Sequence, residues 1–313
     1  MRAVALLSFL PLLIYGCTRD SARNAIPSAA VAEMHDWVRD PAVVPSEQHS
    51  PPLRLLSLAP NATEICCALG LRDQLLARTR FCDYPPEIRN LPEVGDLAEI
   101  NPETLVALRP DLVLVSGASR AITDKLVRLG LRFESLPDRN LEDVFAAVER
   151  VGRLTGRPLT AAKLCDELKR ELDQLAAKCA AVPRQRVLIL LAPLSSPPAP
   201  PFAAGPGSFY DDLLRRAGQA NALAEEGRAF GPLALEAILR IDPDVIIELQ
   251  PDGSDRPGGD ADALRAWSRL GNLKAVANRR VQVLTGRQHY IPGPRVVQIF
   301  AELCRILGGE AHE

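Results

Sequence analysis

Two kinds of apolar pattern alternate along the chain from about residue 53 to residue 307. Short continuous apolar runs at 55–58 and 187–191 are typical of strands buried on both faces of a sheet. Segments 141–154 and 295–307 instead carry apolar residues at every third or fourth position, which predicts amphipathic helices. Strands that alternate with helices favour parallel sheets in an α/β fold.

This pattern occurs twice, with an offset of 133 residues. Leu58-Ala59-Pro60 closes the first apolar run, and Leu191-Ala192-Pro193 closes the corresponding later one. The same offset relates the segment that begins at Glu103 to the one that begins at Glu236, each a predicted short helix followed by a buried strand. A further strand and amphipathic helix follow each copy. The repeat therefore predicts two similar α/β lobes.

A long helix is predicted between the two copies, because residues 159–182 contain neither Gly nor Pro. Leu164, Leu168, Leu172 and Leu175 recur there at spacings of three and four. A helix of about 24 residues would be roughly 36 Å long and would join the lobes stiffly. We expect an N-terminal lobe, the linking helix, a C-terminal lobe and a ligand cleft between the lobes; the ranges are 53–157, 158–183 and 184–308, followed by a tail at 309–313.

The N-terminus has the layout of a secretory signal. Arg2 precedes an apolar run over residues 3–14, which is too short to span a bilayer, and Gly16-Cys17 closes it. The end of this segment resembles a bacterial lipoprotein cleavage box in which Cys17 becomes lipidated, although Tyr15 departs from that pattern. Plain signal cleavage and a buried N-terminal element are the alternatives. Residues 18–52, rich in proline and without periodicity, predict a tether.

Charge and histidine content exclude several classes of function. The net charge of −2, from 37 basic and 39 acidic residues, argues against a general nucleic-acid binder. Among four histidines, His289 alone lies within the patterned region, which excludes a multi-histidine metal site. Without a Gly-x-Ser-x-Gly elbow or a phosphate loop, the chain is expected not to be an enzyme. A secreted α/β hydrolase using carboxylates such as Asp83, Asp96 and Glu99 is the remote alternative.

The cysteine spacing does not form a disulfide framework. Cys165 and Cys179 lie on one predicted helix, roughly 21 Å apart, and so cannot bridge each other. We expect the cysteines after Cys17 to be buried free thiols, with a bridge from Cys82 to Cys66 or Cys67 as the alternative.

Several short motifs occur in a characteristic order from about residue 53 to residue 307. With these motifs the chain resembles the vitamin B12, haem and ferric-siderophore group of substrate-binding proteins for bacterial ABC importers. The resemblance implies two lobes joined by one helix, a monomer in the periplasm or on the cell surface, and a lipid anchor. It also implies delivery of a metal chelate, as cargo rather than cofactor, to a permease dimer with ATPase subunits. The motifs are residues 57–64 (SLAPNATE), 82–86 (CDYPP), 101–103 (NPE), 108–113 (LRPDLV), 204–210 (AGPGSFY), 242–247 (DPDVII) and 292–295 (PGPR).

Candidate ligand-binding residues lie on loops that should meet at the cleft. Asn61 is a predicted helix N-cap after the first strand, where binding crevices of α/β sheets form. His289 and Tyr290 carry ligand atoms suited to iron or cobalt, and Arg295 suits an anionic group. Core packing of the aromatics and structural roles for His289 and Arg295 are the alternatives. The candidates are Pro60, Asn61, Phe81, Tyr84, Asp96, Leu97, Gly117, Phe209, Tyr210, Phe230, His289, Tyr290 and Arg295.

The sequence indicates the type of metal chelate less clearly than it indicates the family. The stretch Asp83-Tyr84-Pro85 is similar to the cobalamin-directed branch of the group, so a cobalt corrinoid is the first expectation. Leu97 stands where a large aromatic residue would be expected against a corrin. Ferric siderophore and haem therefore remain alternatives, the latter through His289 and Tyr290.

Glu103 and Glu236 occupy equivalent positions in the two halves, each at the start of a predicted short helix. Pseudo-symmetry should expose one carboxylate on the same face of each lobe. In the family that the chain resembles, the matching glutamates dock onto arginines of the two permease subunits, which implies electrostatic registration. Simple complementation of the helix dipole is the alternative.

Overall fold

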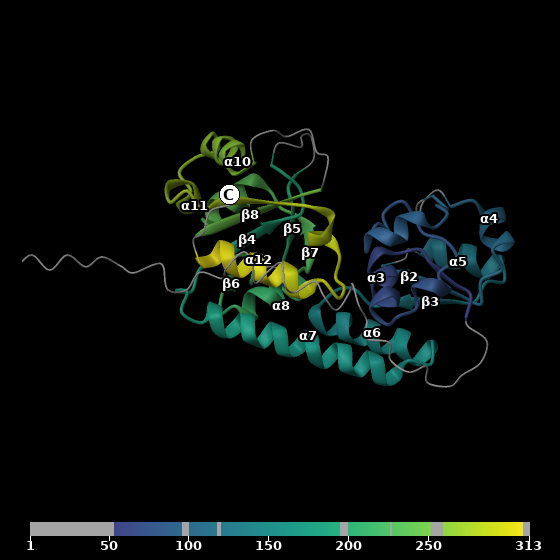
Figure 1. Cartoon of the computed structure of the whole chain (residues 1–313). Coiled ribbons are helices and arrows are strands. Elements are labelled where there is room, and N and C mark those ends of the chain that lie inside the picture. The colour runs from purple at the N-terminus through teal and green to yellow at the C-terminus, as the bar shows by residue number, and fades with distance from the viewer. Residues whose placement is uncertain are drawn as a thin grey trace, which may run out of the picture.

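The computed structural model describes residues 53–95, 100–117, 120–194, 200–225, 227–251 and 259–308. They form two α/β lobes above one long helix (Figure 1). The predicted signal, Cys17 and the tether, together with Asp96, Leu97 and the tail from residue 309, lie outside the described residues. None of the described helices combines the length and the apolar character needed to cross a membrane.

The first lobe has a fully parallel sheet in the order β1 (Leu55–Ser57), β2 (Leu112–Ser116) and β3 (Phe133–Leu136). All three strands are short, and β1 and β2 are largely buried, as expected where helices cover the sheet, whereas only Leu136 of β3 is buried. The Asn140 side chain and Asp143 form a capping box that starts the last helix of the lobe. The helices are α3 (Pro60–Ala68), α4 (Pro102–Ala107), α5 (Arg120–Arg128) and α6 (Leu141–Leu154), with 3₁₀ turns η2 (Arg72–Gln74) and η3 (Pro86–Asn90).

The second lobe has a mixed sheet in the order β7-β5-β4-β8-β9, with β6 beside β4. Strands β4, β6, β8 and β9 are parallel, whereas β5 and β7 run antiparallel to their neighbours. The α/β fold class is confirmed, but parallel sheets were predicted for both lobes. The two antiparallel strands have only three residues each, too few for a periodic pattern. The strands are β4 (Arg186–Leu190), β5 (Phe202–Ala204), β6 (Ala220–Asn221), β7 (Phe230–Pro232), β8 (Val245–Gln250) and β9 (Val281–Thr285).

Helices surround this second sheet and complete the chain. The 3₁₀ turn that follows β9 carries His289 and Tyr290. The helices are α8 (Phe209–Arg216), α9 (Leu235–Ile241), α10 (Gly259–Ser268), α11 (Lys274–Ala277) and α12 (Val296–Gly308), and the turn is η4 (Arg287–Tyr290).

The sequence repeat corresponds to a repeat of hydrogen bonds. In the first lobe, the backbone N–H of Arg54 donates to Asp111 Oδ2 at 2.8 Å, and the Asp111 N–H donates to the Arg54 carbonyl at 2.9 Å. Arg186 and Asp244 make the same pair of bonds, at 2.8 and 2.9 Å, in the second lobe. An aspartate thus fixes the register of the first two parallel strands in each half.

Helix α7 (Pro158–Cys179) joins the lobes and runs along the base of both (Figure 1). Its predicted leucine stripe is buried, and it packs against α6 of the first lobe and α12 of the second. A Cβ atom at Gly152 of α6 would lie 2.4 Å from Ala161 Cβ of α7, so this glycine permits the close approach of the two helices. One hydrophobic core therefore extends through both lobes and the helix between them.

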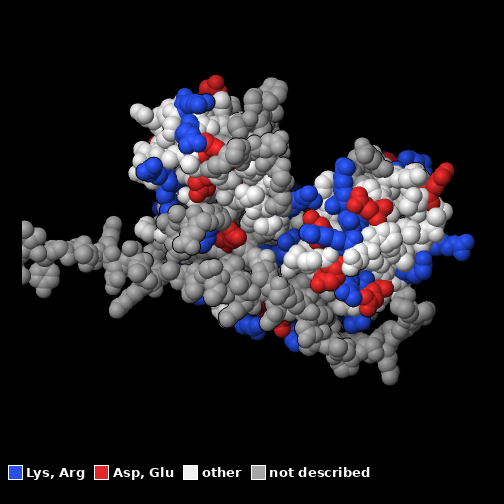
Figure 2. Space-filling model, turned by 45° about the horizontal axis from the view of Figure 1, so that its top comes forward, with Lys and Arg blue, Asp and Glu red and all other residues white. Residues whose placement is uncertain are grey.

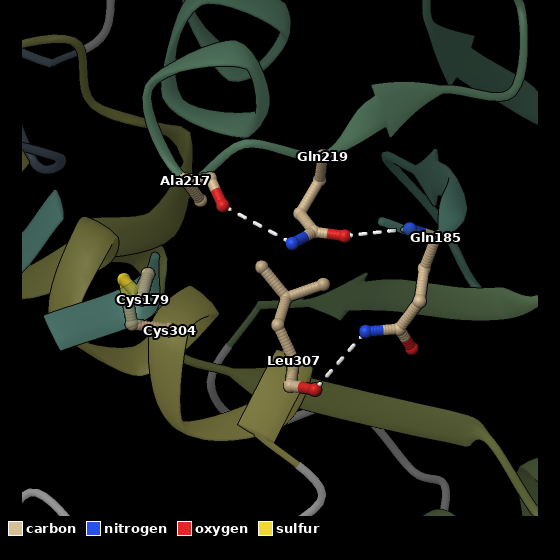
Figure 3. Close-up of a disulfide and its surroundings, with 6 residues drawn as sticks. All are labelled: Cys179, Gln185, Ala217, Gln219, Cys304 and Leu307. Atoms are coloured by element: carbon tan, nitrogen blue, oxygen red, sulfur yellow. Dashed lines mark hydrogen bonds between the residues drawn. A yellow bond between two sulfur atoms is a disulfide. The ribbon is translucent and has the colours of Figure 1, made fainter. Parts of the chain in front are cut away.

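A disulfide between Cys179 and Cys304 joins the end of α7 to α12, with the two Cα atoms 5.9 Å apart (Figure 3). The expectation of free thiols is wrong for these two residues, because a pairing across 125 residues has no local signature. Beside the bridge, the side-chain amide of Gln185 donates a hydrogen bond to the Leu307 carbonyl. This bond ties α12 to the residue that precedes β4.

The other described cysteines are buried free thiols, as predicted, so Cys82 bridges neither Cys66 nor Cys67. Burial raises the pKa of the Cys67 thiol to about 12 and that of Cys165 to about 11. A thiol with so high a pKa carries almost no thiolate at neutral pH, so these cysteines are chemically inert.

A candidate ligand-binding site between the lobes

A cavity of about 630 Å³ lies between the two lobes. The first lobe contributes residues that follow β1, β2 and β3, and the second contributes residues that follow β4, β8 and β9. The parallel strands of both sheets therefore direct their carboxyl ends at one crevice, where ligands of α/β folds bind. Basic side chains border the junction of the lobes on the face in Figure 2. The lining residues are Ala59, Pro60, Asn61, Phe81, Ser116, Asp138, Leu191, Ala192, Pro193, Pro251, Arg287, Tyr290, Ile291 and Pro292.

The polar part of the first lobe's wall is a chain of three side chains. Asn61 Nδ2 donates to Ser116 Oγ at 2.7 Å, and Ser116 Oγ donates to Asp138 Oδ2 at 3.0 Å. Asn61 was predicted to be an N-cap, but α3 begins at Pro60 with Ala59 as its cap residue. Asn61 Oδ1 instead accepts a hydrogen bond from the Ala62 N–H of its own helix, and its amide joins the start of α3 to the end of β2.

The half-buried Asp138 ends this chain. Burial raises the pKa of its carboxyl group, and the hydrogen bond from Ser116 acts in the opposite direction. Gly117, predicted as a ligand contact, is not part of the lining; a Cβ atom there would lie 2.8 Å from Asp138 Oδ2. The absence of a side chain at Gly117 makes room for the Asp138 carboxylate.

Phe81 supplies an aromatic surface at the cavity and keeps 43% of its area exposed. The guanidinium carbons of Arg80 and Arg287 lie 5.1 and 5.8 Å from the centre of its ring. Arg287 also pairs with Asp83 across the lobes, at 3.4 Å. Cation–π contacts of this kind hold an exposed ring in a defined orientation.

A buried ion pair joins the lobes beside the cavity. Arg295 donates to both oxygens of Glu64, at 2.6 and 3.0 Å, and both residues are almost fully buried. The guanidinium also lies 4.0 Å from the centre of the Tyr84 ring. Burial raises the pKa of Glu64, and the charge and hydrogen bonds of Arg295 oppose that rise. Arg295 and Tyr84, predicted to contact ligand, therefore belong to the junction between the lobes and do not line the cavity.

His289 and Tyr290 have different surroundings. The His289 side chain is buried outside the cavity lining, and its carbonyl accepts a hydrogen bond of 2.5 Å from the Tyr210 hydroxyl. Tyr290 lines the cavity, and its hydroxyl is buried with no hydrogen-bond partner among the described residues. Burial raises the pKa of Tyr290, so it is a neutral phenol.

The remaining predicted aromatics are not at the cavity. Phe209 and Tyr210 are each 2% exposed and stack with ring centroids 4.0 Å apart in the main core. Phe230 lies on β7 and packs against the same core. We therefore leave these three out of the proposed site, because α8 turns Phe209 and Tyr210 inward and Phe230 of β7 is not part of the cavity lining. Of the predicted ligand contacts, the cavity brings together Pro60, Asn61, Phe81 and Tyr290.

Ser116, Asp138, Arg287 and residues 191–193 line the cavity but were not predicted. A usable signal existed for two of them. Ser116 ends β2, and Asp138 comes two residues after β3. Polar residues just after consecutive parallel strands meet at one sheet edge, so Ser116 and Asp138 could have been grouped with Asn61.

Neither the cavity nor the rest of the described chain brings together three or more His, Cys, Asp or Glu side chains that could hold a metal ion. The lining is mainly apolar and contains few polar groups, which is typical of a small-molecule site.

Glu103 and Glu236 are both exposed, in the first turns of α4 and α9. One helical turn further on, each is followed by an exposed apolar residue, Val106 at 47% and Leu239 at 41%. These two residues are also related by the 133-residue repeat. The short helices thus present the same acidic and apolar pair on each lobe.

Comparisons with known proteins agree with this architecture. Residues 55–287 match the periplasmic binding protein family. The vitamin B12-binding protein of Vibrio cholerae is 26% identical over 259 residues, which are 82% of this chain and 90% of the relative. A Bacillus subtilis protein, described as an uncharacterised ABC transporter substrate-binding lipoprotein, is 26% identical, over 81% of this chain and 79% of its own. The periplasmic haem-binding protein of Roseiflexus sp. RS-1 is 25% identical and superposes with a TM-score of 0.69, covering 82% of this chain and 98% of that protein.

Proposed function

This chain belongs to the periplasmic binding protein family, and we propose that it captures a cobalt corrinoid of the vitamin B12 type and delivers it to an ABC importer. The cavity carries this proposal: it is apolar, opens between two lobes and is lined from the carboxyl edges of both sheets. The vitamin B12-binding relative supports the choice of ligand. The chain acts by binding and release and catalyses no reaction on its cargo.

Capture and release depend on how the lobes are joined. Helix α7, packed on both lobes, limits closure to small rotations. The Glu64–Arg295 and Asp83–Arg287 pairs hold the two sides of the cavity together. Contacts with the permease would have to separate these pairs to release the ligand.

We further propose that the protein works as a monomer outside the cytoplasm, attached to a membrane through lipidated Cys17. The predicted signal supports export, and the lipoprotein relative supports the anchor. Metabolic labelling with a fatty-acid analogue should label the wild-type protein and leave a Cys17→Ala variant unlabelled.

The function is tested by titrating the purified protein with hydroxocobalamin, followed by visible absorbance and calorimetry, with haemin as the comparison. We expect saturable cobalamin binding with a dissociation constant in the micromolar range or below, about −8 kcal/mol or stronger. Absence of cobalamin binding would contradict the proposal.

Haem is the second candidate, and Tyr290 is the observation that favours it. The Tyr290 hydroxyl is at the cavity wall with no partner among the described residues, and a tyrosine oxygen is a known ligand of haem iron. A haem Soret shift that is lost in Tyr290→Phe, without cobalamin binding, would select this alternative.

We propose that Glu103 and Glu236 orient the protein on a permease dimer through their charges during delivery of the ligand. The exposed Val106 and Leu239 would make apolar contacts with the permease beside them. Replacing both glutamates by alanine should lower uptake at limiting ligand about tenfold or more, because two oriented charge pairs are lost. Ligand affinity should not change. Uptake of labelled cobalamin measures the effect.

The matched control replaces Glu87 and Glu225, one exposed glutamate on each lobe outside α4 and α9, by alanine. This control removes the same net charge and should transport normally. Normal uptake by the Glu103/Glu236 variant would contradict the docking proposal.

A further inference from the structure

The hydrogen bonds on the cavity wall of the first lobe run in one direction, from Asn61 through Ser116 to Asp138. Asn61 donates to Ser116, and Ser116 Oγ lies 3.0 Å from Asp138 Oδ2 and 3.4 Å from the Leu136 carbonyl oxygen, so the contact with Asp138 is the shorter one for its single hydroxyl hydrogen. The Asn61 carbonyl oxygen is occupied by the Ala62 N–H. One N–H of Asn61 is therefore directed at Ser116 and the Ser116 hydroxyl at Asp138, and the chain ends on a carboxylate, which only accepts.

The cavity wall of the second lobe offers hydrogen-bond donors instead of an acceptor. Arg287 of the second lobe is the cationic residue of the described lining, and it supplies N–H donors. Its charge is shared with Asp83, at 3.4 Å. A bound ligand thus meets an acceptor on the first lobe and a donor on the second, with apolar surface between them.

From this arrangement we propose that Asp138 determines specificity, by accepting hydrogen bonds from amide N–H groups on the cargo and by disfavouring cargo with free carboxylates there. The inference rests on the proposed function and narrows its ligand class. Cobalamin carries several primary amides around its corrin ring, and its one phosphodiester suits the arginine side. Haem instead carries two carboxylates and no peripheral N–H donor.

Discrimination follows from the half-buried position of Asp138. A carboxylate covered by ligand loses water and must receive a replacement donor, since an unpaired buried charge is strongly unfavourable. An amide satisfies that need, whereas a ligand carboxylate adds like-charge repulsion. The hydrogen bond from Ser116 and the space left by Gly117 hold the carboxylate in place for this contact.

The test compares the full-length wild-type protein with Asp138→Asn, a substitution of equal shape that keeps an acceptor for Ser116 and removes the charge. The probes are cyanocobalamin, a cobalamin monocarboxylic acid in which one amide is hydrolysed, haemin, and ferrioxamine B, which has N–H groups and no free carboxylate. Calorimetry gives the affinities. Asp166→Asn, at an exposed position on α7, is the control for net charge.

We expect Asp138→Asn to bind cyanocobalamin about tenfold more weakly, to bind haemin or the monocarboxylic acid relatively better, and to unfold at the wild-type temperature. The Asp166→Asn protein should match the wild type. Equal cyanocobalamin affinity in wild type and Asp138→Asn would overturn the inference and leave the proposed function intact.

The two proposals fail in different ways. Wild-type binding to ferrioxamine B but not to cyanocobalamin, with loss in Asp138→Asn, would support the specificity inference and overturn the corrinoid function. Tight wild-type binding of haemin without cyanocobalamin, or no binding of any probe, would overturn both.

Discussion

Replacement of Arg295 by alanine should destabilise the folded protein by about 3–5 kcal/mol, because it leaves the Glu64 carboxylate buried without its partner. Arg295 supplies two hydrogen bonds to Glu64 and also lies over the Tyr84 ring. No other cation among the described residues makes an ion pair with Glu64. Denaturant unfolding measures the loss of stability, because the midpoint and the slope of the transition together give the free energy of unfolding.

The same variant should acquire a distinct pH dependence. Burial and the charge of Asp83 raise the pKa of Glu64, whereas the charge and hydrogen bonds of Arg295 lower it. Removal of Arg295 therefore raises the pKa of Glu64 further. Between the ordinary glutamate pKa and the raised one, the folded state holds a proton that the unfolded state has released. Stability of the variant then falls as pH rises through this window. The deficit relative to wild type should be smaller at pH 5 than at pH 8.

Two variants control this experiment. Arg287→Ala removes the more exposed interlobe pair with Asp83 and should cost less than about 1 kcal/mol. Glu64→Gln combined with Arg295→Met removes both charges and should be less destabilised than Arg295→Ala alone. An Arg295→Ala protein as stable as Arg287→Ala would show that the buried pair does not hold the lobes.

Loss of the Cys179–Cys304 bridge should cost about 2–5 kcal/mol, because the bridge closes 125 residues of chain and restricts the unfolded state. The double variant Cys179→Ala/Cys304→Ala removes it without introducing buried hydroxyl groups. The bridge ties the connecting helix to α12, so its loss weakens the attachment of α7 to the second lobe. Denaturant unfolding in the presence and absence of a reductant is the measurement.

Cys165→Ala is the matched control, since Cys165 lies on the same helix and is buried but unpaired. It should lose only the packing of one sulfur and the weak hydrogen bond of that thiol to the Phe145 carbonyl, and its stability should respond to reductant as the wild type does. The double variant should be insensitive to reductant. Wild-type stability that reductant leaves unchanged would contradict the prediction.

Local patterns predicted the three longest helices of the described chain, α6, α7 and α12, and the longer strands. Helix α6 begins and ends where its apolar periodicity does, and α7 differs from its predicted range by one residue at the start and three at the end. Strands β5 and β7 were missed, because three residues carry too little pattern and their pairing depends on neighbours distant in sequence.

The site was predicted only in part. Pro60, Asn61, Phe81 and Tyr290 lie at the cavity, whereas Phe209 and Tyr210 turned out to be core residues. An aromatic at a helix start has the same local signature whether the helix turns it inward or outward. Arg295 was predicted to suit an anionic ligand group, with a structural role as the alternative; the structure pairs it with Glu64, 231 residues earlier.

The sequence by itself determined the repeated α/β halves, the helix between them and the family, because periodicity, motif order and the 133-residue offset are properties of the linear chain. Tertiary structure alone decided the Cys179–Cys304 bridge, the Glu64–Arg295 pair and the hydrogen-bond chain that ends at Asp138. Each of these depends on the distance and direction between side chains brought together by the packing of whole lobes. These contacts form only when apolar residues from distant segments are buried together in one core. No single segment of the sequence specifies that packing.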